Sequence, residues 1–215
     1  MTAHANYTGT LLIFDLDGTL YQTESSFVPT MRSVYDEYGV PYPSDETILG
    51  QVGEPFPAFL DWLGRQGFPD NLGEVARRIT ELELISIERH GRLFDDVEEA
   101  LHALRDAGHT IALCTNGDMR YAQYVLSSCG VLTLFDRLQT NEMGNATKTD
   151  LLRELLVHVD HERAFMIGDR YHDMEAGRAN GCTVVAATYG YGTVEELAHA
   201  DRQLASFPEI LSVVG

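Results

Sequence analysis

The residues of this sequence best suited to chemistry are acids that follow apolar runs. The stretch at 11–20 reads LLIFDLDGTL, in which four apolar residues lead directly into Asp15 and Asp17 follows two positions later. Asp169 and Asp173 stand at the end of another apolar run. Carboxylates that converge without histidine or cysteine suit a hard, oxygen-preferring cation such as Mg²⁺. A carboxylate can also act as a nucleophile, as in aspartyl-phosphate chemistry.

Three other polar side chains stand at comparable places. Thr115 and Asn116 follow the apolar run TIALC, and Lys148 opens a helical pattern. A hydroxyl, an amide and an ammonium group can hold the oxygens of a phosphoryl group, whose charge must be stabilised during transfer.

The elements that position these residues are short strands alternating with helices. Apolar runs without polar alternation predict buried parallel strands at 11–15, 110–115, 163–169 and 183–188, with a weaker candidate at 135–140. Helical patterns lie between them at 97–108, 119–130, 148–159 and 173–181. This alternation predicts an α/β fold with a parallel sheet. Ligands bind beyond the carboxyl ends of such strands, so the polar residues should meet at one edge.

The segment from 21 to 90 interrupts this alternation. It contains helical patterns separated by proline and glycine turns, and no convincing strand. We therefore expect a core domain formed by residues 1–20 and 91–215, and a helical domain formed by residues 21–90.

Composition excludes several classes of function. A net charge of −18 argues against nucleic-acid and acidic-membrane partners, because both need basic surface. No apolar run is long enough to span a membrane and the first residues lack the features of a secretory signal, so we expect a cytoplasmic protein. The three cysteines and eight histidines lack the spacing of a disulfide framework or a zinc site.

Four short motifs carry a resemblance to a known family. DLDGTL at 15–20, CTNGD at 114–118, Lys148, and GDRYHD at 168–173 resemble, in order, the motifs of the haloacid dehalogenase superfamily of hydrolases. The resemblance covers residues 11–200. It implies a Rossmann-like parallel sheet of order 3-2-1-4-5, with a helical cap inserted after the first strand.

The resemblance also implies roles for the acids. Asp15 would attack phosphorus and become an aspartyl phosphate, and Asp17 would protonate the leaving oxygen and then activate water. The Mg²⁺ cofactor would be bound by Asp15, the backbone carbonyl of Asp17 and Asp169, with Asp173 supporting it from further out. The acid at position 17 favours phosphoryl transfer, since the dehalogenases of the superfamily lack it.

The remaining polar residues would bind the substrate. Thr115 and Asn116 would hold the phosphoryl oxygens, and Lys148 would pair with Asp15 and the phosphate. The sequence departs from the family pattern at Thr149, where proline often follows the lysine, and at 94–96, where a Pro-Gly turn is common.

Within the superfamily, the sequence is most similar to enzymes of the phosphoglycolate phosphatase type. We therefore predict a Mg²⁺-dependent phosphatase that acts on a small-molecule phosphate ester, as a monomer or homodimer. The alternatives are a nucleoside 5′-monophosphate phosphatase, a sugar phosphomutase, and a non-catalytic phosphate-binding module.

Overall fold

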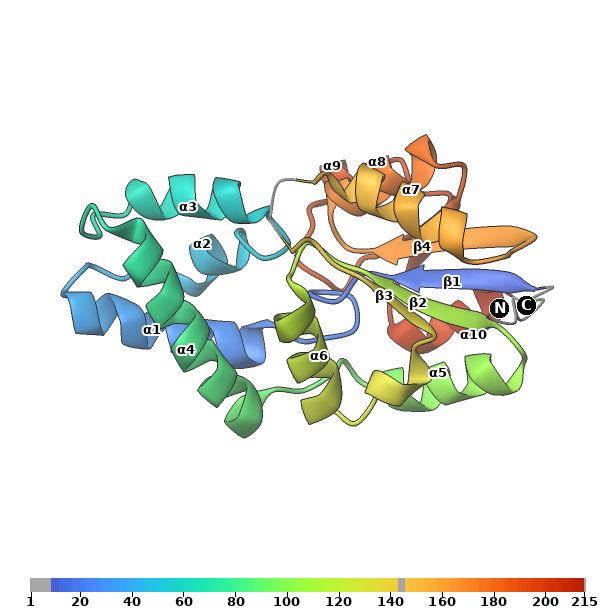
Figure 1. Ribbon diagram of the computed structural model, residues 1–215, viewed down its shortest axis with the longest axis horizontal. Coiled ribbons are helices and arrows are strands. Elements are labelled where there is room, and N and C mark those ends of the chain that lie inside the picture. The colour runs from blue at the N-terminus through green and yellow to red at the C-terminus, as the bar shows by residue number, and fades with distance from the viewer. Residues whose placement is uncertain (1–8, 143–145, 215) are drawn as a thin grey trace, which may run out of the picture.

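The protein is built on a parallel sheet with helices on both faces (Figure 1). The computed structural model describes residues 9–142 and 146–214. The sheet has six strands in the order β3-β2-β1-β4-β5-β6. The strands are β1 Thr10–Phe14, β2 Thr110–Cys114, β3 Arg137–Gln139, β4 Arg163–Gly168, β5 Thr183–Ala187 and β6 Arg202–Leu204. The predicted α/β class and the order 3-2-1-4-5 are confirmed.

The sixth strand, β6, was not predicted. It has only three residues, of which the first two are exposed, so it forms no apolar run. It pairs in parallel with β5 at the edge of the sheet, where Ala186 lies opposite Gln203.

Strand β1 lies at the centre of the sheet, and every one of its residues is buried. Leu12 lies opposite Ile111 of β2 on one side and Phe165 of β4 on the other. Successive side chains of a strand point to opposite faces. Accordingly, Leu12 belongs to the apolar cluster on one face and Ile13 to the cluster on the other.

Both faces of the sheet are covered. In Figure 1, α7, α8 and α9 lie above the sheet, and α5 and α10 lie below it. These helices are α5 Val97–Asp106, α6 Met119–Ser128, α7 Lys148–His158, α8 Tyr171–Ala179, α9 Val194–Leu197 and α10 Ile210–Val214, with short 3₁₀ turns at Leu132–Leu134 and Phe207–Glu209. Because apolar clusters fill both sides, the strands carry no polar alternation.

The segment before α5 forms helices with an apolar core of their own. They are α1 Glu24–Tyr38, α2 Asp45–Leu49, α3 Phe56–Gly64 and α4 Leu72–His90. Their cluster includes Met31, Trp62 and Ile79. In Figure 1 they lie beyond the ends of β1 and β4 to which the arrowheads point. The carboxyl edge of the sheet therefore faces the helices.

Two neighbouring chain segments connect these helices to the sheet. The Gln22 amide donates to the Arg92 carbonyl at 3.0 Å, and the Phe94 amide donates to the Leu20 carbonyl at 3.0 Å. The segment thus leaves and rejoins the rest of the chain at one place. In the following turn, Asp96 adopts a left-handed backbone with a φ of 60°, a conformation that favours glycine.

Across residues 9–142 and 146–214, none of the helices has both the length and the apolar character required to cross a bilayer.

Candidate active site

The predicted acids meet at the carboxyl edge of the sheet. Asp15 follows β1 directly, and its amide donates to the Ile167 carbonyl at 2.9 Å, which extends the pairing of β1 and β4 by one residue. The chain then turns at Gly18, whose φ is 78°. A Cβ atom at Gly18 would lie 2.2 Å from Oδ2 of Asp169, so only glycine fits this turn.

Three of these acids form a group suited to a metal ion. Asp15, Asp169 and Asp173 are buried and each offers an oxygen atom, and these atoms lie within 4.8 Å of one another. An oxygen-only donor set matches the preference of Mg²⁺. Burial, followed by the charge of Asp173, raises the pKa of Asp169 to about 7. A divalent cation would relieve this crowding of negative charge.

Lys148 is the cation that the structure places among these acids. It is the first residue of α7, and its Nζ atom lies 2.5 Å from Oδ1 of Asp15 and 2.5 Å from Oδ1 of Asp173. Burial alone would lower the pKa of Lys148, but the two carboxylates raise it above its ordinary value. Burial still raises the pKa of Asp15, although Lys148 opposes this shift. One ammonium group therefore does not neutralise the cluster.

The side chain of Asp17 is not one of the three in the group suited to a metal ion, and it accepts hydrogen bonds from two hydroxyl groups. Thr23 donates to its Oδ1 atom at 2.8 Å and Tyr121 donates to the same atom at 2.7 Å. Burial raises the pKa of Asp17, whereas these two hydrogen bonds lower it. Sequence reasoning missed both donors, because Tyr121 lies 104 residues away and nothing in its local pattern separates it from a packing residue.

Thr115 and Asn116 follow β2, as predicted, and both line the same cavity as Asp15. The Thr115 hydroxyl accepts a hydrogen bond from the Gly117 amide at 3.1 Å. The Asn116 amide group donates to the Gly53 carbonyl at 2.9 Å, which links this strand end to the loop between α2 and α3. Asp118 caps α6 by accepting from the Tyr121 amide at 2.8 Å.

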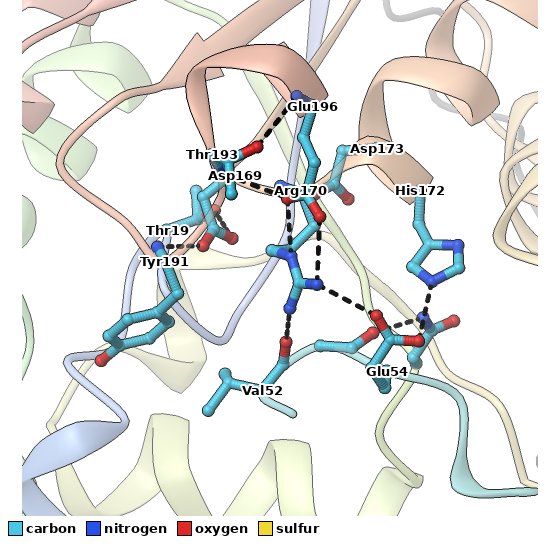
Figure 2. A network of polar contacts seen from close by, with 12 residues as sticks. Thr19, Val52, Glu54, Asp169, Arg170, His172, Asp173, Tyr191, Thr193 and Glu196 are labelled. Atoms are coloured by element: carbon cyan, nitrogen blue, oxygen red, sulfur yellow. Dashed lines mark hydrogen bonds and ion pairs between the residues drawn. The ribbon is translucent and has the colours of Figure 1, made fainter. Parts of the chain in front are cut away.

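Arg170 forms a second link between the same loop and the sheet. Figure 2 shows its guanidinium group between Glu196 on one side and the loop on the other. It donates to Glu196 and to Glu54, each at 3.0 Å, and also to the Val52 carbonyl. The sequence drew attention to Arg170 only as a member of the fourth motif, and its partners became visible only in the fold.

The segment at 188–193, TYGYGT, packs against Asp169. The Tyr191 amide donates to Oδ2 of Asp169 at 2.7 Å, and the Thr19 hydroxyl donates to Oδ1 at 3.3 Å (Figure 2). A Cβ atom at Gly192 would lie 1.8 Å from the backbone oxygen of Asp169. The glycines therefore allow this segment to approach Asp169 closely and fix its carboxylate.

A cavity of about 550 Å³ lies between the strand ends and the helices α1, α3 and α4. Asp15, Asp17 and Thr115 line it from the sheet, and Phe59 and Glu83 line it from the helices. Its size falls within the range typical of small-molecule sites. The arrangement can place a phosphate ester against paired carboxylates, with a cation beside them.

The fold and these acids define a class of enzyme. Residues 12–187 match the model of the haloacid dehalogenase-like hydrolase family. The chain belongs to this family, and the resemblance inferred from its motifs is confirmed.

The chain is also similar to individual proteins over most of its length. A phosphoglycolate phosphatase of Haemophilus influenzae is 29% identical over 95% of this chain and 97% of its own length. The tyrosine-protein kinase PtkA of Mycobacterium tuberculosis is also 29% identical, over 86% of this chain and 64% of its own length. A haloacid dehalogenase-like hydrolase from Streptococcus pneumoniae superposes with a TM-score of 0.84 at 23% identity, covering 98% of this chain and all of the other. The family and the full-length match to phosphatases make this chain an enzyme of the phosphatase class.

The close packing at Gly192 gives a prediction about stability. Replacing Gly192 with alanine should lower the free energy of unfolding by about 1–3 kcal/mol, because the added methyl group collides with backbone. Urea unfolding would measure this change. The matched control is Gly50→Ala, whose Cβ atom would make ordinary contacts at 3.5 Å and should change stability by less than about 0.5 kcal/mol. Equal stability of the two variants would contradict the packing described here.

Proposed function

We propose that this protein is a Mg²⁺-dependent phosphatase that hydrolyses a small phosphorylated metabolite through an aspartyl-phosphate intermediate on Asp15. The observation that carries the proposal is the buried set of Asp15, Asp169 and Asp173 with Lys148 among them, of which Asp15 also lines the cavity. The relatives named phosphoglycolate phosphatase support it and make phosphoglycolate the reference substrate.

Each residue has a defined part in this proposal. Oδ of Asp15 attacks phosphorus while Asp17 gives a proton to the leaving oxygen, and Asp17 then takes a proton from the water that cleaves the acyl phosphate. Lys148, Thr115 and Asn116 hold the phosphoryl oxygens. Mg²⁺, held by Asp15, Asp169 and the backbone carbonyl of Asp17 with support from Asp173, would supply positive charge for the phosphoryl oxygens.

The helices α1–α4 act in this proposal as a cap domain, with residues 21–90 as the cap and 1–20 with 91–215 as the core. Their separate apolar cluster and the paired connections at Gln22 and Arg92 support this division. A cap limits the access of bulk water and contributes the walls that select the substrate. The proposal keeps the expected cytoplasmic location.

A sugar phosphomutase is the alternative that uses the same intermediate, because it returns the phosphoryl group to a sugar instead of water. Two assays with Mg²⁺ separate the possibilities. Release of inorganic phosphate from p-nitrophenyl phosphate and from a small phosphate ester supports the phosphatase, whereas isomerisation of a hexose phosphate without net release supports the mutase. Failure to act on any of them would support a non-catalytic module.

The nucleophile can be tested by Asp15→Asn. This change should lower turnover by at least about a thousandfold, because an amide cannot form the acyl phosphate. The fold should survive, since Lys148 keeps its contact with Asp173 at 2.5 Å. Phosphate release and circular dichroism would be measured together, with Asp160→Asn on the surface as the control. Substantial activity in a folded Asp15→Asn protein would refute the assignment.

The metal can be tested without an activity assay. Mg²⁺ that binds only the folded state should raise the free energy of unfolding, by about 2.7 kcal/mol when its concentration is a hundred times the Kd. Thermal unfolding with and without Mg²⁺ would show this shift. We expect a much smaller shift in Asp169→Asn and a normal one in Asp160→Asn. No shift in the wild type, or an equal shift in all three proteins, would argue against the site.

The hydrogen bond from Tyr121 predicts a change in pH dependence. Since that bond lowers the pKa of Asp17, Tyr121→Phe should raise this pKa further. Asp17 then holds its proton to higher pH, so the limbs of the pH–rate profile that depend on it should move to higher pH. Tyr124→Phe, on the same helix but without this bond, should leave the profile in place. An unmoved profile in Tyr121→Phe would remove Asp17 from the acid–base role.

A further inference from the structure

The cavity extends well beyond the space needed for a phosphoryl group. Its volume is about 550 Å³, which falls within the range of cavities that hold drug-sized ligands. Part of its wall is apolar and comes from α1 and α3, where Phe27, Phe56 and Phe59 line it. Phe56 is 49% exposed, so its ring is accessible from the cavity that it lines. The space fits a leaving group with an apolar portion.

Glu83 lines the cavity near the reacting end. It lies on α4, and its carboxyl group is close enough to Asp17 for the charge of that residue to affect it. Burial, followed by the charge of Asp17, raises the pKa of Glu83 to about 8. Within residues 9–142 and 146–214, no side chain forms a hydrogen bond or ion pair with this carboxyl group. It is therefore a polar group without a protein partner that faces the substrate space.

Cationic groups are scarce in the same wall. Among the described lining residues, Arg77 is the only lysine or arginine. Its side chain is 62% exposed and paired with Glu81. It also precedes Glu83 by six residues on the same helix, which places it about 9 Å further along the axis. Lys148 is engaged by Asp15 and Asp173.

These contacts conflict with a short phosphorylated acid as substrate. Such a molecule would bring its carboxylate into a cavity whose described lining includes the acids Asp17 and Glu83 and, as a cation, only Arg77. Burial of a charge without a partner is strongly unfavourable, and a neighbouring carboxyl group supplies no positive charge in either protonation state. A hydroxyl group beside Glu83 would hydrogen-bond this carboxyl group in either protonation state, because it both donates and accepts, and an amino group would donate to it.

We propose that the substrate is the phosphate monoester of an alcohol that carries a hydrogen-bond donor, a hydroxyl or an amine, beside Glu83 and an apolar portion against Phe27, Phe56 and Phe59, and that short phosphorylated acids are poor substrates. This inference rests on the proposed phosphatase function and specifies its substrate class. It separates this chain from its relatives named phosphoglycolate phosphatase.

A matched pair of esters tests the inference in the wild-type protein with Mg²⁺. Phosphoglycolate and 2-hydroxyethyl phosphate have the same length and differ in carrying a carboxylate or a hydroxyl group. We expect kcat/KM to be at least about tenfold higher for 2-hydroxyethyl phosphate, and higher again for its phenyl-substituted analogue. An equal or higher value for phosphoglycolate would overturn the inference and leave the phosphatase function standing. Failure to hydrolyse any ester, p-nitrophenyl phosphate included, would overturn both.

Reversing the charge at position 83 provides an independent test. Glu83→Lys should raise the ratio of kcat/KM for phosphoglycolate to that for 2-hydroxyethyl phosphate by at least about tenfold, because the new ammonium group can pair with the carboxylate. Glu88→Lys makes the same charge change on the exposed part of α4 and should leave the ratio unchanged. If this kcat/KM ratio is the same in Glu83→Lys and Glu88→Lys, any change comes from the net charge of the protein, and the role of Glu83 is overturned. If Glu83→Lys does not fold, the wild-type comparison still decides.

Discussion

The structure around the site depends on one electrostatic constraint, the burial of several carboxylates beside a single lysine. Asp15, Asp169 and Asp173 bring oxygen atoms within 4.8 Å of one another, and Lys148 contacts two of these residues. Buried like charges repel strongly, because little water remains to screen them. Burial, and then the charge of Asp173, raises the pKa of Asp169 to about 7. A divalent cation would neutralise part of this buried negative charge. Metal binding should therefore affect both the stability of the fold and the proposed chemistry.

The parallel sheet is what makes this arrangement possible. Asp15 follows β1 and Asp169 follows β4, and these strands are neighbours, so residues far apart in the sequence end at one edge. Glycines then allow the chain to approach them closely, as at Gly18 and Gly192. Several tightly packed positions thus lie at the site, where packing from both faces of the sheet holds them in place.

In the proposed function, the helices α1–α4 contribute to the choice of substrate rather than to the chemistry. Their loop is tied to the sheet through Asn116 and Arg170, and their inner surfaces complete the cavity. The reacting end is built from motif residues, whereas the wall near Glu83 and the phenylalanines is built by the helices. The residues that carry the reaction and the residues that select the substrate can therefore vary separately. The family match specifies the reaction far more than the substrate.

The sequence alone determined the fold class and the positions of the acids, because apolar runs that end in polar residues are a local signal. The order of the first five strands was implied by the resemblance of its motifs to the family. The sequence did not indicate β6, which is too short and too exposed to form such a run. It also did not indicate Tyr121 and Thr23 as donors to Asp17, Arg170 as the link to Glu54, or Glu83 in the cavity wall. Only the tertiary structure decided these contacts, because they join residues from separate elements whose side-chain directions depend on how the helices pack against the sheet.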